Sequence, residues 1–207
     1  MTPDFSAVLL AGGKSRRMGR DKAFVEIKGV PLWKRQLRIL DQLAPAEILL
    51  AGPSHPEWND VGCRIVADAR AEAGPLGGLV AALRCCSTAL LLALAVDLPQ
   101  MTSDYLRQLL KLCQRGKGVV PIGGPKCFEP LVAVYPRSAL GIGEELLANG
   151  QYSMQNFANL CLVRGLTNES LIAPAEVLLF LNMNTAGDLA TVCGQNLATP
   201  GRRDIAS

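Results

Sequence analysis

The sequence predicts a single α/β domain of three layers, in which helices cover both faces of a mostly parallel, Rossmann-like sheet. Short apolar segments alternate with segments of helical spacing from residue 5 to about residue 193. A chain of 207 residues fits one domain and can bury a core of ordinary size. Its composition, 49% hydrophobic and 19% charged, is typical of a globular protein rather than a disordered one.

The first half of the chain carries the clearest alternation. Apolar runs bounded by turn residues predict strands, and apolar residues spaced by about 3.6 positions predict helices. Pro31 suits the first turn of its helix, because its fixed φ and missing N–H cost nothing there. In chain order the expected elements are strand 5–11, an extended segment 23–30, helix 31–43, strands 47–52 and 63–68, helix 75–86 and strand 89–97.

The second half continues with a helix that Thr102 or Ser103 caps. Its last apolar run, VLLFLNMN, is expected as a strand that ends in asparagines. We expect one domain over 1–193 and a disordered tail over 194–207. The expected elements are helix 102–113, strands 118–123 and 127–136, helix 137–148, the strand within 177–184 and helix 185–193.

Composition also limits the classes of function. A net charge of +3 is too small to indicate a nucleic-acid binder. The start, MTPDFSAVLL, lacks the basic region of a signal peptide, and the longest apolar run, 89–96, is too short to span a membrane. Seven cysteines without a C-x-x-C pair, and one histidine, His55, indicate neither a disulfide framework nor a zinc site. We therefore expect a cytoplasmic protein with reduced thiols and no membrane or nucleic-acid partner.

Glycines, acids and amides follow the predicted strands. Gly12 and Gly13 follow the first strand, while Asp68, Asp97 and the asparagines 182 and 184 follow later ones. Ligands of open α/β sheets bind beyond the carboxyl ends of the strands. These residues are therefore expected to share one edge of the sheet and to form a site there.

The segment LLAGGKSRRMGRDK (9–22) joins glycines to a dense group of basic residues. It is not a Walker A loop, because Val8 stands where the first glycine is needed, and Lys14 breaks the dinucleotide pattern G-x-G-x-x-G. Glycines still let backbone N–H groups approach an anion. A solvated basic turn is the alternative interpretation. The side chains that could neutralise a triphosphate are Lys14, Arg16, Arg17 and Lys22.

The same segment resembles the signature L-A-G-G-x-S-x-R-M-G-x-D-K of the molybdenum cofactor guanylyltransferases, which belong to the larger nucleotidyltransferase family. Three later segments resemble further motifs of that family, and all lie in the expected order over residues 6 to about 190. They are GPLGGL (74–79), VDLP (96–99) and LNMNT (181–185).

The resemblance implies a fold of the nucleotidyltransferase type and a reaction in which the terminal phosphate of molybdopterin attacks the α-phosphorus of GTP and releases pyrophosphate. Asp97 would ligate Mg²⁺, while Lys22 and Arg16 would act on the phosphates. Other proteins of molybdenum cofactor biosynthesis, or acceptor apoenzymes, would be transient partners. The implied GTP and pterin contacts are Leu10, Ala11, Gly12, Gly13, Lys22, Asp68, Gly74, Pro75 and Leu76 for the nucleotide and Asn182 and Asn184 for the pterin.

The resemblance favours guanine, because related cytidylyltransferases carry L-A-A-G at positions 10–13 and lack the G-P-L form at 74–76. The loop AGPSHP (51–56) lacks the asparagine expected for a base contact. Each residue also has a plain structural interpretation: Asp97 could cap a helix, and Asp68 could be a turn residue. Alternative functions are a cytidylyltransferase of the same cofactor, another small-molecule nucleotidyltransferase, or a GTP-binding regulatory module.

Overall fold

The computed structural model describes residues 3–12, 21–59, 61–70, 72–124 and 127–182. Gly13, Arg16, Asn184, the predicted helix 185–193 and the predicted tail 194–207 lie outside these ranges, as do Lys14 and Arg17. Within them, helices alternate with strands along the chain.

The described strands form one large sheet and one small hairpin. The large sheet has eight strands in the order β10-β7-β9-β6-β1-β4-β5, with β8 paired to β7. β1, β4, β5 and β6 are mutually parallel, whereas β9 runs antiparallel to both of its neighbours. The mostly parallel sheet is thereby confirmed. The strands are β1 Ser6–Leu10, β4 Ile48–Ala51, β5 Arg64–Val66, β6 Leu90–Ala95, β7 Gly118–Gly124, β8 Cys127–Phe128, β9 Val132–Pro136 and β10 Thr167–Leu171, with β2 Glu26–Ile27 and β3 Val30–Pro31 in the hairpin.

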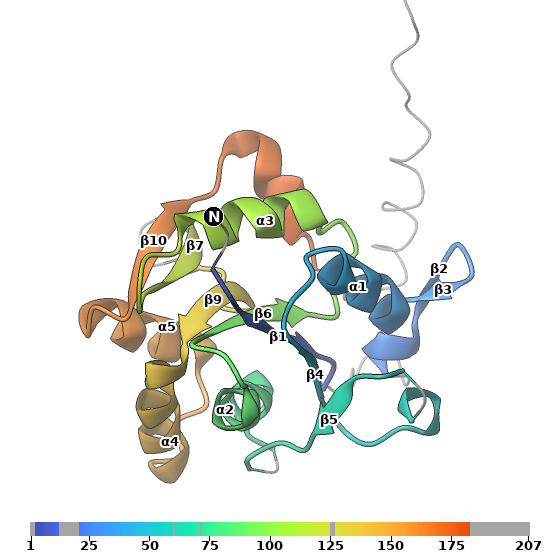
Figure 1. Cartoon of the computed structure of the whole chain (residues 1–207), viewed down its shortest axis with the longest axis horizontal. Helices are drawn as coiled ribbons and strands as arrows, with labels where there is room; N and C mark the ends of the chain where they lie inside the picture. Colours follow the sequence, from blue (N-terminus) through green and yellow to red (C-terminus); the bar gives the residue numbers. More distant parts are fainter. Residues whose placement is uncertain (1–2, 13–20, 60, 71, 125–126, 183–207) are drawn as a thin grey trace, which may run out of the picture.

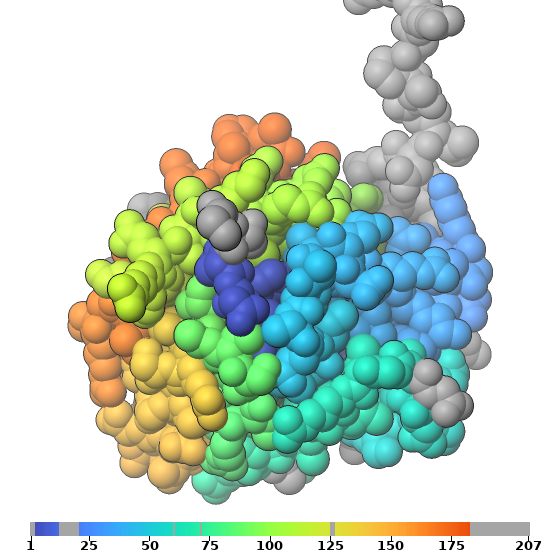
Figure 2. All heavy atoms as spheres, in the orientation of Figure 1, coloured from blue at the N-terminus to red at the C-terminus, as the bar shows by residue number. Residues whose placement is uncertain are grey.

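Helices cover both faces of the sheet, as Figure 1 shows. One apolar cluster lies between the sheet and α1 (Leu32–Asp41) and α3 (Ser103–Leu112). A second cluster lies between the opposite face and the helices α2 (Pro75–Cys85), α4 (Leu140–Ala148) and α5 (Met154–Val163). Because β1 is buried on both faces, it reads as a continuous apolar run. In Figure 2 the dark blue start of the described chain is enclosed by green and light blue segments, as expected for an inner strand.

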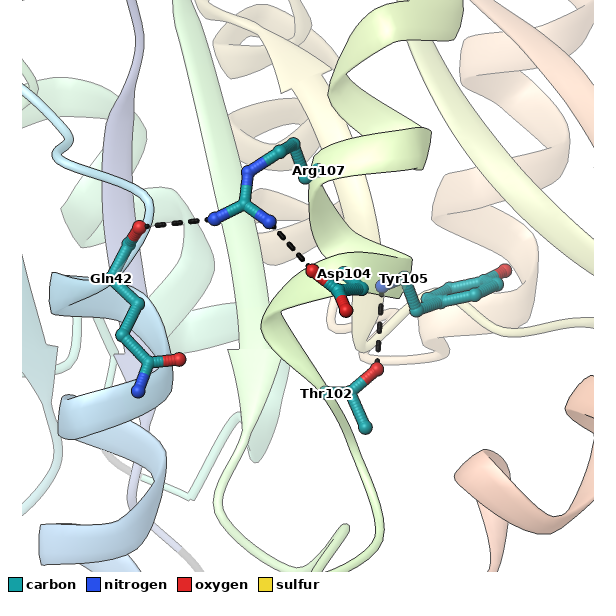
Figure 3. Close-up of polar contacts among 5 residues, drawn as sticks. All are labelled: Gln42, Thr102, Asp104, Tyr105 and Arg107. Atoms are coloured by element: carbon teal, nitrogen blue, oxygen red, sulfur yellow. Dashed lines mark hydrogen bonds and ion pairs between the residues drawn. The ribbon is translucent and has the colours of Figure 1, made fainter.

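The start of α3 shows how the chain turns after β6. The Thr102 hydroxyl accepts a hydrogen bond from the Tyr105 N–H at 3.3 Å, so Thr102 is the N-cap residue (Figure 3). Arg107 donates to Asp104 at 2.7 Å and to the Gln42 carbonyl at 3.2 Å, and the second bond joins α3 to the end of α1 (Figure 3). The connection between β6 and α3 is therefore fixed at its far end.

Several expected elements differ in detail. Pro31 ends β3 and precedes the first residue of α1. The segment 127–136 is divided into β8 and β9, with Glu129 and Pro130 between them. The segment 137–148 begins with a turn of 3₁₀ helix, η3 (Arg137–Ala139), before α4.

The expected strand within 177–184 is wrong. Residues Pro174–Phe180 form a 3₁₀ helix, η4, in which Pro174 occupies the first turn and Glu176 accepts from the Ala173 N–H at 2.9 Å. Phe180 packs edge-on against Tyr105 of α3, with ring centroids 5.3 Å apart. Phe180 therefore packs on a helix, whereas Val177, Leu178 and Leu181 of the same run are exposed. The sequence prediction also missed α5 and β10.

The six cysteines that the structure describes are free thiols. Among the described residues, none of the helices is both long and apolar enough to cross a membrane.

Candidate functional site

A cleft of about 1080 Å³ lies at the carboxyl ends of β1, β4, β5 and β6. Parallel pairing brings these four ends to one edge of the sheet, with Leu10 in register with Ala51 and with Ala95. The lining residues are Leu10, Ala11, Gly12, Lys22, Ala51, Gly52, Pro53, Ser54, Ala67, Asp68, Glu72, Gly74, Pro75, Gly78, Ala95, Val96, Asp97 and Leu131.

The backbones that follow β1 and β4 approach each other closely. A Cβ atom at Gly52 would lie 3.1 Å from the Gly12 nitrogen and 3.2 Å from the Ala11 carbonyl carbon. A Cβ at Gly12 would meet the Gly52 Cα at an ordinary 3.6 Å. Glycine at position 52 therefore allows two backbone segments to form adjoining walls of the cleft.

The start of α2 forms another wall. Gly74 has φ +61°, a conformation that side chains disfavour, and Pro75 occupies the first turn of the helix. Within the helix, a Cβ at Gly78 would lie 3.1 Å from the Ala51 Cβ and 3.2 Å from Asp68 Oδ1. The small residue lets the helix start close to the sheet, and the positive end of the helix dipole favours an anion at this side of the cleft.

Lys22 opens a short 3₁₀ helix, η1 (Lys22–Phe24), at the end of the glycine and arginine segment. The preceding Asp21 is its N-cap, and the carboxylate of Asp21 accepts from the Ala23 N–H at 3.0 Å. Phe24 packs against the rings of His55 and Trp58, with centroid separations of 3.9 and 5.7 Å. These contacts attach η1 to the loop after β4, so that Lys22 is held beside the cleft.

His55 lies in the loop after β4 and is half-buried against Phe24. Its Nδ1 accepts from the Glu57 N–H at 3.2 Å, which caps a short 3₁₀ helix, η2 (Pro56–Trp58). Its ring thereby contributes to the aromatic contacts that hold the 52–58 loop.

The Lys22 ammonium nitrogen lies 3.0 Å from Asp97 Oδ2. Both side chains are mostly withdrawn from solvent, with 21% and 20% of their surfaces exposed. Asp97 follows β6, whereas the helix that starts after it is capped by Thr102. Asp97 therefore does not cap α3, and its contact with Lys22 crosses the cleft between two loops.

The cleft has the donors that a magnesium ion uses. Mg²⁺ in phosphoryl-transfer sites takes one or two carboxylates and completes its shell with substrate phosphates and water. Asp97 supplies one hard oxygen ligand at the cleft, next to a cation and to the backbone of Gly12. A single partly buried carboxylate beside a glycine segment and a lysine fits that ion.

Two further carboxyl groups have altered acidity. Burial raises the pKa of Asp68, which follows β5 and lines the cleft. Burial likewise raises the pKa of Glu129, which is half-buried between β8 and β9. A raised pKa increases the proton-donating capacity of a carboxyl group near neutral pH.

Most of the residues predicted for the site that the structure describes are together in the cleft. They are Leu10, Ala11, Gly12, Lys22, Asp68, Gly74, Pro75 and Asp97. Leu76, in the first turn of α2, is fully buried in the core and does not line the cleft. Asn182 follows η4, is exposed, and does not line the cleft either. Gly13, Arg16 and Asn184 lie outside the described residues.

Sequence reasoning missed cleft residues in two loops. Gly52, Pro53 and Ser54 line the cleft, and the glycine that ends the predicted strand 47–52 was the available signal. Glu72 also lines it and has φ +63°, an uncommon conformation for a residue with a side chain. Nothing in the sequence indicates that conformation.

Comparison with known proteins gives consistent matches. A family model described as MobA-like NTP transferase domain matches residues 7–160. A protein of Opitutus terrae named "Probable molybdenum cofactor guanylyltransferase" is 36% identical over 83% of this chain and 85% of its own. A Pseudomonas putida protein named molybdenum cofactor guanylyltransferase is 30% identical over 79% of this chain and 87% of its own.

A solved structure shows the same fold. The molybdopterin-guanine dinucleotide biosynthesis protein A of Archaeoglobus fulgidus superposes with a TM-score of 0.73. The alignment covers 92% of this chain and 99% of that protein, at 22% sequence identity.

Proposed function

The chain belongs to the MobA-like NTP transferase family, and on that premise we propose that it transfers GMP from GTP to the terminal phosphate of molybdopterin. The enzyme class is nucleotidyltransferase, and the relatives carry names from molybdenum cofactor biosynthesis. The observation that carries the proposal is the Lys22–Asp97 pair, which brings a cation and a hard oxygen ligand to one cleft beside a glycine segment.

The reaction forms a bond between a phosphate oxygen of molybdopterin and the α-phosphorus of GTP, and breaks the bond to the departing pyrophosphate. A phosphate monoester is already anionic near neutral pH, so the enzyme does not need a strong general base. Positioning and charge neutralisation then provide most of the catalysis. In this proposal Lys22 neutralises the triphosphate, and the backbone of Ala11 and Gly12 lies against its oxygens. Gly13 and Arg16 are proposed to extend this phosphate-binding segment.

Asp97 is proposed to hold Mg²⁺ together with the phosphates of GTP. A bound magnesium ion would supply Lewis-acid polarisation of the phosphoryl oxygens and would reduce their negative charge. Asp97 contributes the carboxylate that fixes this ion at the cleft. Lys22 then exchanges its contact with Asp97 for a contact with phosphate.

The base and ribose are proposed to lie between the loop after β4 and the start of α2. Asp68, with its raised pKa, and the turn at Gly74 and Pro75 face this part of the cleft. Leu76 supports the turn from the core. Asn182 and Asn184 are proposed to contact the pterin from the segment after η4.

A panel of the four nucleoside triphosphates, with Mg²⁺ and molybdopterin, tests the proposal. Formation of the dinucleotide and release of pyrophosphate are measured together. We expect GTP to give both products at a much higher kcat/KM than CTP. Equal or better turnover with CTP would assign the chain to the cytidylyl reaction, and GTP binding without either product would indicate a regulatory module.

A further inference from the structure

Gln36 is a fully buried polar residue in α1. The helix buries its apolar face with Leu32, Trp33, Leu37 and Leu40, and Gln36 occupies the middle of that face with 0% of its surface exposed. The spacing of the face is that of a core-facing helix, in which an apolar residue is expected. A glutamine there must make a hydrogen bond or lose free energy.

The Gln36 side chain reaches the loop that carries Asp97. Its Nε2 donates to the Leu98 carbonyl at 2.6 Å, a buried bond between residues 62 positions apart. The same carbonyl accepts from the Met101 N–H at 3.1 Å, which closes the turn after Asp97. The turn ends at Thr102, the N-cap of α3 in Figure 3. Gln36 therefore fixes the near end of a turn whose far end is already anchored.

The glutamine that makes this bond lowers the stability of the folded protein. Gln36 Oε1 is buried, and no group among the described residues donates to it. An unpaired buried acceptor lowers stability, whereas an apolar side chain of similar length would remove both the donor and the unpaired oxygen. Leu98 is only 3% exposed. If the Gln36 amide were removed, water could not readily reach the Leu98 carbonyl to replace it as donor.

We propose that Gln36 is a positioning residue that holds the Asp97 carboxylate in its place for the metal. The inference deepens the proposed function and rests on Asp97 as a metal ligand. Gln36 acts through the Leu98 carbonyl and does not itself reach the cleft lining. Polar residues that reduce core stability are expected where function requires a fixed loop.

The decisive variant is Gln36→Met, which keeps the length of the side chain and removes its polar atoms. The primary readout is binding of Mn²⁺ in the presence of GTP, measured by water-proton relaxation without any second substrate. We expect Mn²⁺ to bind roughly ten-fold more weakly than to the wild type, the scale of one hydrogen bond. Hydrogen exchange at Met101 should become faster, kcat should fall by about the same factor, and the Tm should stay equal or rise.

Thr167→Val is the matched control. Thr167 lies in the edge strand β10 and is 2% exposed. Like Gln36 Oε1, its Oγ1 has no hydrogen-bond partner among the described residues, but Thr167 does not line the cleft. Its replacement should leave Mn²⁺ binding and kcat unchanged. If Gln36→Met fails to fold, Gln36→Leu provides the same measurement with a different apolar shape.

Asp97→Asn separates the two levels of the proposal. If Asp97→Asn weakens Mn²⁺ binding but Gln36→Met leaves it within two-fold of wild type, the positioning role is overturned and the proposed function stands. If Asp97→Asn also binds Mn²⁺ as the wild type does, Asp97 is not the metal ligand and the positioning role of Gln36 is overturned with it, whereas the proposed GMP transfer is decided separately by the nucleotide panel. Weakening by both variants, with Thr167→Val unchanged, supports the inference.

Discussion

The ammonium nitrogen of Lys22 lies 3.0 Å from the carboxylate of Asp97, although the two residues are 75 positions apart. Lys22 ends the glycine and arginine segment, and Asp97 begins the loop after β6. The pair places opposite charges side by side at the cleft. In the proposed reaction a triphosphate with its metal offers each of them a partner of opposite charge, so the pair can open at little electrostatic cost.

Lys22→Ala should lower kcat/KM about a hundred-fold or more, because it removes the cation that we propose stabilises the departing pyrophosphate. Steady-state kinetics with GTP as the varied substrate measures the loss. Arg20→Ala is the control, since the resembled signature leaves that position variable, and it should have a much smaller effect. Similar losses in the two variants would mean that the segment acts only as a diffuse positive surface.

Gly12→Ala should fold normally and change nucleotide preference. The new methyl group meets the Gly52 Cα at an ordinary 3.6 Å, so we expect a stability change of about 0.5 kcal/mol or less. Gly12 adjoins Gly52 of the loop after β4, which is proposed to face the base, so a methyl group there should reduce the GTP-to-CTP ratio of kcat/KM, roughly ten-fold. Competition assays with both nucleotides measure the ratio, and an unchanged ratio would separate Gly12 from base selection.

Gly52→Ala provides the contrast in the same wall. Its Cβ would lie 3.1 Å and 3.2 Å from backbone atoms of Gly12 and Ala11, which cannot move as a flexible side chain can. We expect a loss of about 1–3 kcal/mol in the free energy of unfolding. Urea denaturation measures it, and a variant as stable as Gly12→Ala would show that these two backbones separate easily.

Two of the strands that end at the cleft, β1 and β6, were predictable because they are buried on both faces. β1 and β6 read as unbroken apolar runs, and parallel pairing alone places Gly12, Asp68 and Asp97 on one edge. β10 gave no such signal, because it is an edge strand with exposed and half-buried polar residues. Its pairing with β7 comes from backbone hydrogen bonds that the sequence does not indicate.

Other features depend on contacts between distant segments. The hydrogen bond from Gln36 to Leu98 and the approach of Gly52 to Gly12 each require the folded sheet. α5 was missed although its signals were present, with Ser153 as N-cap and Met154, Phe157 and Cys161 on one buried face. In η4, the apolar run VLLF suggested a strand, while Pro174 and Glu176 marked the start of a helix.

Glu47 should make the stability of the protein depend on acid pH. Burial opposes its ionisation, but hydrogen bonds from Ser87 and Ser6 and the charge of Arg64 outweigh it and lower the pKa of Glu47. A lowered folded-state pKa adds stability above the pKa of the unfolded chain, and this stability is lost as pH falls through the folded-state value.

Glu47→Gln should therefore be less stable than the wild type near neutral pH and should lose less stability on acidification below about pH 4.5, the ordinary glutamate value. Urea denaturation at a series of pH values measures how the free energy of unfolding of each protein changes with pH. Glu169→Gln, on the exposed side of β10, is the control and should follow the wild-type curve. Parallel curves for Glu47→Gln and wild type would contradict the linkage.

Asp97→Asn distinguishes a metal ligand from a structural residue. Asparagine keeps the size of the side chain and can still accept a hydrogen bond from Lys22, but a neutral amide oxygen is a weaker ligand for a hard cation. The variant loses the charge of the ion pair but keeps an acceptor within reach of the Lys22 ammonium group, so the Tm should stay close to that of the wild type. Turnover should fall to a small fraction of the wild-type rate, and higher Mg²⁺ or added Mn²⁺ should restore part of that rate. The comparison needs only a thermal melt and a metal titration of turnover. Near-normal turnover at ordinary Mg²⁺ would remove Asp97 from the reaction and would leave Lys22 as the main charged group acting on the phosphates.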